Sequence, residues 1–243
     1  MATVPGGEAI EGLDALTIKR ASTAEQVAEA LRAMILSGEL EQGRALREVV
    51  LANTTGVSRN TMREAIRVLA REGLVTHHLH RGAIVTRLTE RDVEDIFRVR
   101  RTVELAAVEA TASASAEALG GLAQAVDQLA AAAAAMDSGA VIDADRLFHE
   151  RLVAILGSQR LDRFFDAIQA EMRLCMSIVD RRDLEEGDRL VAEHRELLAL
   201  IEAGEVERCA EVMAGHLADS ERMLKQIVAG DPGPEPPRSR GRR

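Results

Sequence analysis

Beyond Leu88 the sequence shows one dominant pattern, in which apolar residues recur every three or four positions in stretches mostly separated by glycine. This spacing places apolar side chains on one face of an α-helix, and glycine often marks a helix end. The pattern predicts six helices joined by short connections, which is typical of a helical bundle. The predicted helices span about 89–114, 116–137, 140–156, 159–182, 185–203 and 205–229. We expect Gly120–Gly121 to shorten or bend the second helix.

The residues before Leu88 follow a different plan: two helices, a tight turn, a third helix and a hairpin. Ser22 with Glu25 can form a capping box for the first helix, and Ser58 can cap the third. This order predicts a winged helix-turn-helix. The segments are a helix from Ser22 to about Gly38, a short helix ending near Thr54–Thr55, a turn at Gly56, a helix over about 59–72, and β-like runs at 74–76 and 83–86.

Charge is divided unevenly between these two parts of the chain. The whole chain carries −9, yet residues 19–87 hold 11 Lys and Arg against 7 Glu, a net +4, and residues 88–230 hold 16 against 28, a net −12. Such asymmetry indicates nucleic acid as a partner at one end only. The predicted organisation is a mainly α protein with a flexible arm (1–18), a winged helix-turn-helix domain (19–88), an all-α domain (89–229) and a disordered tail (230–243).

Composition excludes membrane and secreted classes. No apolar run approaches the ~20 residues that span a bilayer, and the first 20 residues show no basic stretch followed by an apolar core, so we expect no secretory signal. Two cysteines, Cys175 and Cys209, suit a reducing cytoplasm, and we interpret them as small core residues. Trp and Tyr are absent, so the core must be aliphatic with four Phe. We therefore expect a cytoplasmic protein with no membrane partner.

The segment "GVSRNTMREAIRVLAREGLV" (56–75) combines an apolar helix face with a row of arginines. Helical spacing turns Met62, Ala65, Ile66 and Leu69 inward and the arginines outward. Arginine pairs with guanine, asparagine reads adenine, and a helix N-terminus holds phosphate, so the outer face suits a DNA major groove. The alternative is a solvated face whose arginines pair with Glu64 and Glu72. The wing histidines and Arg81 can touch DNA or be plain loop residues.

The segment "LREVVLANTTGVSRNTMREAIRVLAREGLV", with the later "RGAIV", resembles the DNA-binding domain of GntR-type bacterial transcription regulators. Together, the outward face and this resemblance imply a set of DNA-binding residues: Arg47, Ser58, Arg59, Asn60, Thr61, Arg63, Arg81 and Gly82. Two positions depart from the family pattern. Gln42 stands where the family usually has proline, and Val49 stands where it usually has an arginine that contacts DNA.

Four residues of the helical region form a candidate metal site. Asp145 and His149 lie four apart on one helix face, and His194 and His216 lie on two later helices. Three imidazoles and one carboxylate suit zinc, with nickel, manganese or iron as alternatives, and leave positions open for water or ligand. Taken singly, each histidine is more often a surface or a satisfied core residue.

Residues 89–229 resemble the all-helical FCD effector domain of the FadR-type subgroup, through "DVEDIFRVRRTVELAAVEATA", "DADRLFHERLVAILG" and "VAEHRELLALIEAGEVERCAEVMAGHL". Six helices favour its VanR-like branch. The resemblance implies a divalent metal on the four candidate ligands and a small organic acid whose carboxylate reaches that metal. It also implies that Arg100 faces the effector; a surface ion pair with Glu104 is the alternative.

The sequence therefore predicts a homodimeric, ligand-responsive transcription regulator, expected to be a repressor, that binds a short inverted-repeat operator in double-stranded DNA. Two alternatives remain. The four metal-site residues can activate water in a metal-dependent hydrolase, although this leaves the winged helix unexplained. The metal can also be purely structural, with no effector.

Overall fold

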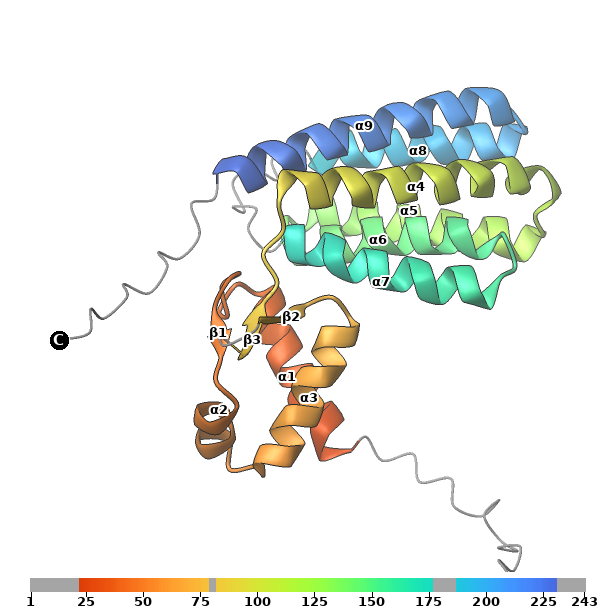
Figure 1. Ribbon diagram of the computed structural model, residues 1–243. Helices are drawn as coiled ribbons and strands as arrows, with labels where there is room; N and C mark the ends of the chain where they lie inside the picture. The colour runs from red at the N-terminus through yellow and green to blue at the C-terminus, as the bar shows by residue number, and fades with distance from the viewer. Residues whose placement is uncertain (1–21, 79–81, 177–186, 231–243) are drawn as a thin grey trace, which may run out of the picture.

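The computed structural model describes residues 22–78, 82–176 and 187–230. The predicted arm (1–18), Arg81 and all but the first residue of the predicted tail lie outside the described residues. The chain is mainly helical, with a small winged helix-turn-helix followed by a larger all-α domain (Figure 1). The fold class expected from the sequence is confirmed.

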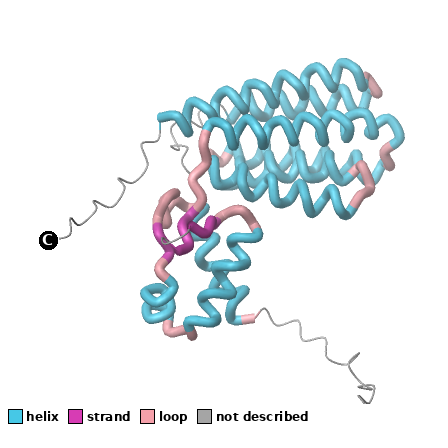
Figure 2. Tube along the Cα trace, in the orientation of Figure 1, coloured by secondary structure: helices cyan, strands magenta, loops and turns pink. Residues whose placement is uncertain are grey.

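The N-terminal domain combines three helices with a small sheet, and α1 and α2 both pack on α3 (Figure 2). All its strands are antiparallel, in the order β1-β3-β2. Strand β1 was not predicted, because two residues are too few to leave an alternating pattern. The elements are α1 (Thr23–Leu36), β1 (Ala45–Leu46), α2 (Glu48–Thr55), α3 (Arg59–Arg71), β2 (Val75–His78) and β3 (Gly82–Val85).

Local hydrogen bonds fix where these helices begin. Ser22 and Glu25 form the predicted capping box of α1. The Ser58 hydroxyl accepts a hydrogen bond from the Thr61 amide at 3.0 Å, which caps α3 as expected. The inward face of α3 is fully buried, as its spacing predicts; it consists of Met62, Ala65, Ile66 and Leu69. The outward face of α3 is thereby fixed in direction.

The second domain holds six α-helices in the described residues, as its periodicity predicts. Helix α4 runs beside α9, and α5 beside α6 (Figure 1). Helix α5 passes through Gly120 and Gly121 without interruption, because its Ala- and Leu-rich sequence and its packing on α6 outweigh a cost of ~1 kcal/mol per glycine. The helices are α4 (Glu90–Ala110), α5 (Ala116–Ala134), α6 (Ser138–Ala154), α7 (Gln159–Met176), α8 (Gly187–Ala203) and α9 (Val206–Gly230).

One large hydrophobic core continues from the winged helix into the helical domain. It includes Phe97, Phe148 and Phe165, which are almost fully buried. Cys175 and Cys209 are buried in it as predicted, and burial raises the pKa of their thiols to about 12 and about 11. Both are therefore packing residues with little thiolate.

Within the part of the chain that the structure describes, every helix is too short or too polar to cross a membrane.

Candidate functional site

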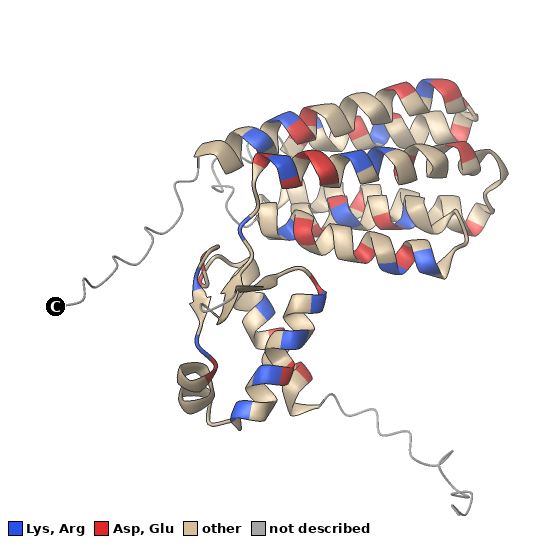
Figure 3. Cartoon of the chain, viewed as in Figure 1, with Lys and Arg blue, Asp and Glu red and all other residues tan. Residues whose placement is uncertain are grey.

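The outward face of α3 carries the predicted DNA-binding residues in an accessible arrangement. Ser58, Arg59, Asn60 and Arg63 are exposed, and Thr61 is half-buried beside the cap. Arginine positions recur along α3, whose ribbon carries several blue segments in Figure 3. The first turn of α3 therefore presents cationic and polar groups at a helix N-terminus, which suits contact with bases and phosphates.

The ion pairs on this surface are few and exposed. Arg63 Nε lies 3.1 Å from Glu48 Oε2, and the Arg63 side chain is 49% exposed. Arg67 pairs with Glu64 on the same helix at 2.6 Å. Arg59 makes no ion pair within the described ranges. Exposed pairs contribute only about 0–1 kcal/mol, so phosphate can replace these carboxylates.

The remaining DNA-binding candidates lie outside α3. Arg47 is exposed at the N-cap position of α2. Gly82 is exposed at the start of β3 with φ of 76°, a conformation that favours glycine. Arg81 lies outside the described residues. The structure thus brings Arg47, Gly82 and the α3 residues into one domain.

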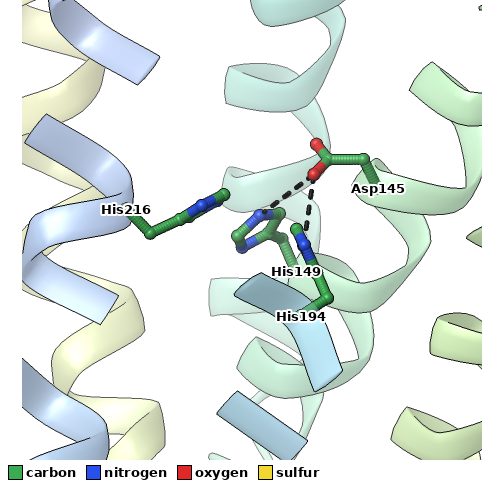
Figure 4. A group of neighbouring side chains, drawn as sticks. All are labelled: Asp145, His149, His194 and His216. Atoms are coloured by element: carbon green, nitrogen blue, oxygen red, sulfur yellow. Dashed lines mark ion pairs between the residues drawn. The ribbon is translucent and has the colours of Figure 1, made fainter. Parts of the chain in front are cut away.

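The four candidate metal ligands converge in the helical domain. Asp145 and His149 come from α6, His194 from α8 and His216 from α9 (Figure 4). One potential ligand atom of each lies within 4.8 Å of the others. Asp145 Oδ1 is 3.2 Å from His194 Nε2 and 3.7 Å from His149 Nε2. The three imidazoles are buried and Asp145 is partly exposed.

Each histidine makes a hydrogen-bonding contact through its Nδ1 atom, which leaves its Nε2 atom for the cluster. His149 Nδ1 is 2.5 Å from Glu104 Oε2, and His216 Nδ1 is 2.8 Å from Glu193 Oε2. His194 Nδ1 is 2.9 Å from the Leu190 carbonyl. Within the described residues, the buried Nε2 atoms of His149 and His194 make no hydrogen bond, and the polar atom that they face is Asp145 Oδ1. This arrangement fits a metal, because metal-bound histidines donate their other N–H to a carboxylate or carbonyl.

Glu104 links the cluster to Arg100. Its Oε1 accepts from Arg100 Nε at 2.7 Å while its Oε2 contacts His149. Burial alone would raise the pKa of the Glu104 carboxyl, but Arg100 and His149 outweigh burial and lower it to about 2. Arg100 is only 3% exposed, so the alternative of a surface ion pair is wrong. One buried nitrogen of its guanidinium, Nη2, makes no hydrogen bond in the part of the chain that the structure describes.

A cavity of about 690 Å³ adjoins these groups. Arg100, Asp145 and His216 line it together with apolar side chains such as Met172 and Met223. A buried arginine, potential metal ligands and apolar side chains therefore line one space, which is typical of small-molecule sites.

Sequence analysis missed the groups that hold the histidines in place. Glu104 lies 45 residues before His149, and Glu193 lies 23 residues before His216. The hydrogen bond from His216 lowers the pKa of the Glu193 carboxyl to about 2. The one available signal was the position of Glu104 four residues after Arg100 on the same helix.

A winged helix with an exposed arginine face, followed by a separate helical domain, defines the class of DNA-binding transcription regulators. Two family models match the chain: "Bacterial regulatory proteins, gntR family" over residues 23–85 and "FCD domain" over residues 95–219. The chain therefore belongs to the GntR family of bacterial transcription regulators and carries an FCD domain.

Individual relatives agree with this membership. A solved structure of a putative transcriptional regulator GntR from Rhodococcus sp. RHA1 shares 31% identity with a TM-score of 0.73, over 86% of this chain and 99% of that one. The uncharacterized HTH-type transcriptional regulator YdhC of Bacillus subtilis is 27% identical over 82% of this chain and 89% of that protein. The gluconate operon transcriptional repressor of Bacillus licheniformis is 36% identical over 56% of each chain. These relatives are regulators, not enzymes.

Proposed function

We propose that this regulator is a repressor that binds a short inverted-repeat operator as a homodimer. A twofold dimer presents two recognition helices to two half-sites. The exposed face of α3, with Ser58, Arg59, Asn60 and Arg63, supports this proposal. Two relatives that carry the name gluconate operon transcriptional repressor support the sign of regulation.

The second part of the proposal is a divalent metal on Asp145, His149, His194 and His216. Zinc suits this donor set best, and nickel, manganese and iron are alternatives. The buried Nε2 atoms of His149 and His194 support it, because both face Asp145 Oδ1 without a hydrogen bond and both imidazoles are held through Nδ1. A metal bound there would supply positive charge facing the cavity.

The third part is a small carboxylic acid as effector. Arg100 carries it, because this residue lines the same cavity as Asp145 and His216 and has a buried guanidinium nitrogen without a hydrogen bond in the described residues. A buried cationic donor without a partner is costly, and a carboxylate satisfies it with a charge-assisted hydrogen bond. The apolar side chains of the cavity, among them Met172 and Met223, would contact the remainder of the acid.

The test is fluorescence anisotropy of the zinc-loaded protein on DNA from upstream of its own gene, with scrambled DNA as control. Gluconate, succinate, citrate and benzoate are added in turn. At least one acid is expected to weaken operator binding in the wild type and not in Arg100→Leu. Operator binding that no acid alters, with no acid raising the melting temperature, would contradict the effector proposal.

A structural metal without an effector is the second candidate. It predicts that chelation unfolds the helical domain while no acid shifts the melting temperature. The geometry does not support the hydrolase alternative, because the nearby acids are engaged. Glu193 is bonded to Arg189 and His216, and Glu150 to Arg146.

A further inference from the structure

Helix α7 connects the cavity to the DNA-binding domain through two of its faces. Residues with helical spacing on one face line the cavity: Gln169, Met172, Arg173 and Met176. On another side, Glu171 Cγ lies 3.1 Å from where a Cβ on Gly73 would stand. Gly73 directly follows Glu72, the C-cap of the recognition helix. A bound ligand that displaces α7 would therefore also displace the contact between Glu171 and Gly73 at the C-terminal end of α3.

Gln42 makes one hydrogen bond to the helical domain and a second to the segment that connects the domains. Its side chain is buried, with 5% exposure, in the loop between α1 and β1. Its Nε2 donates to the Leu174 carbonyl of α7 at 2.8 Å, and its Oε1 accepts from the Leu88 amide at 3.3 Å. Leu88 lies just before α4, so one amide group ties the winged helix to α7 and to the connection between the domains.

The backbone around Gln42 does not by itself require glutamine. The Arg44 amide donates to the Glu41 carbonyl at 3.1 Å, and Gly43 has φ of 81°. This is a tight turn with a left-handed third residue, in which proline is favoured at the second position. Glutamine at this position lacks the fixed φ of proline, but its side chain reaches two backbone groups, the Leu174 carbonyl and the Leu88 amide. Its role is therefore in the contact between domains.

We propose that Gln42 is a positioning residue that couples occupation of the cavity to the placement of the DNA-binding domain. This inference rests on the proposed function. Helix α7 packs on α6, which carries Asp145 and His149, so a ligand or metal that occupies the cavity wall shifts α7. A shift of ~1 Å takes the Leu174 carbonyl beyond hydrogen-bond range of Gln42. The arrangements with and without the bond from Gln42 to Leu174 then differ in free energy, which is the requirement for coupling between the two sites. Coupling of this kind typically changes the affinity for the second ligand, here DNA, about 5- to 150-fold.

Hydrogen exchange and DNA binding of the full-length protein test this proposal, with zinc as the only ligand. Zinc added to chelator-treated wild type is expected to change exchange in residues 40–46 and the dissociation constant for DNA. In Gln42→Leu both changes should disappear, while calorimetry gives a zinc affinity within about twofold of wild type. Gln128→Leu, an exposed glutamine of α5, is the matched control and should respond as wild type.

A second variant separates the coupling from folding. Gln42→Glu keeps the shape and an acceptor for Leu88, but a carboxylate cannot donate to the Leu174 carbonyl. Without metal, it should raise exchange in residues 170–176 about tenfold, the effect of losing one hydrogen bond. The proposal would be overturned if zinc changed exchange and DNA affinity in both Gln42 variants as it does in wild type. It would also be overturned if zinc left hydrogen exchange in residues 40–46 of wild type unaltered.

The two proposals can fail separately. Wild type that binds no zinc would refute the proposed metal site, and the metal-free exchange of Gln42→Glu would still decide the role of Gln42. Exchange equal to wild type in residues 170–176 would then refute that role.

Discussion

Two arginines, Arg63 in the winged helix and Arg100 in the helical domain, show how differently the two domains use one kind of ion pair. Arg63 is 49% exposed and lies 3.1 Å from Glu48. Arg100 is 3% exposed and lies 2.7 Å from Glu104, which is fully buried. The side chains are chemically the same in both pairs, and only their surroundings differ.

Solvent decides what each pair can do. An exposed pair contributes about 0–1 kcal/mol and is easily exchanged, so Arg63 remains available to a phosphate or a base. A buried pair cannot be broken without leaving an uncompensated charge, so Glu104 holds Arg100 and His149 in fixed positions. The DNA-binding face is thus exchangeable, and the cavity wall is preorganised.

The largest expected effect comes from removing Glu104. Glu104→Ala should lower the free energy of unfolding by about 3–5 kcal/mol, because it leaves Arg100 buried without its partner. Asp95→Ala, which removes an exposed partner of Arg98, should cost less than about 1 kcal/mol. Urea denaturation compares the two variants. Equal losses would show that the contrast between buried and exposed pairs has no energetic basis.

Metal removal should have the next largest effect, in the helical domain. Zinc at about 100 times its dissociation constant contributes ~2.7 kcal/mol, which corresponds to a melting temperature about 5–10 °C higher than with chelator. Asp145→Asn should lose most of this difference. Asp143→Asn, two residues away and 51% exposed, is the control and should keep it. Calorimetry in zinc and in chelator gives the answer; an unchanged melting temperature in wild type counts against the site.

Arginine substitutions on α3 should affect DNA binding and leave stability unchanged. Arg59→Ala and Arg63→Ala should each weaken operator binding by about 1–3 kcal/mol if they contact bases, or lower the salt slope by about one if they contact phosphate. Arg98→Ala, an exposed arginine of α4, should do neither. Anisotropy titrations at several salt concentrations distinguish these cases. If both α3 variants bound DNA as tightly as wild type, α3 would not be the recognition helix.

The smallest expected effect comes from removing a helix cap in each domain. Ser58 caps α3 and Ser115 caps α5 through equivalent hydrogen bonds, of 3.0 and 3.2 Å. Each serine-to-alanine change should cost ~1 kcal/mol of stability. Only Ser58→Ala should also weaken DNA binding, since its hydroxyl lies at the proposed phosphate site. Thermal melts and anisotropy on both variants check this; equal DNA affinity would assign Ser58 a capping role alone.

The sequence by itself determined the local features. Periodicity predicted the helices and the buried face of α3, and a spacing of four placed Asp145 and His149 on one side of α6. The caps at Ser22 and Ser58 were predictable for the same reason, because such features depend on residues a few positions apart and on the fixed geometry of a helix turn. Strand β1 escaped prediction because it exists only through pairing with β3.

Only the tertiary structure decided which distant residues meet. It brought His194 and His216 to Asp145 and His149, buried Arg100, and placed Glu104 and Glu193 behind the imidazoles. The bond from Gln42 to Leu174 joins residues 132 positions apart. No periodicity encodes such contacts, because they arise only when whole helices pack together and bring residues far apart in the sequence into contact.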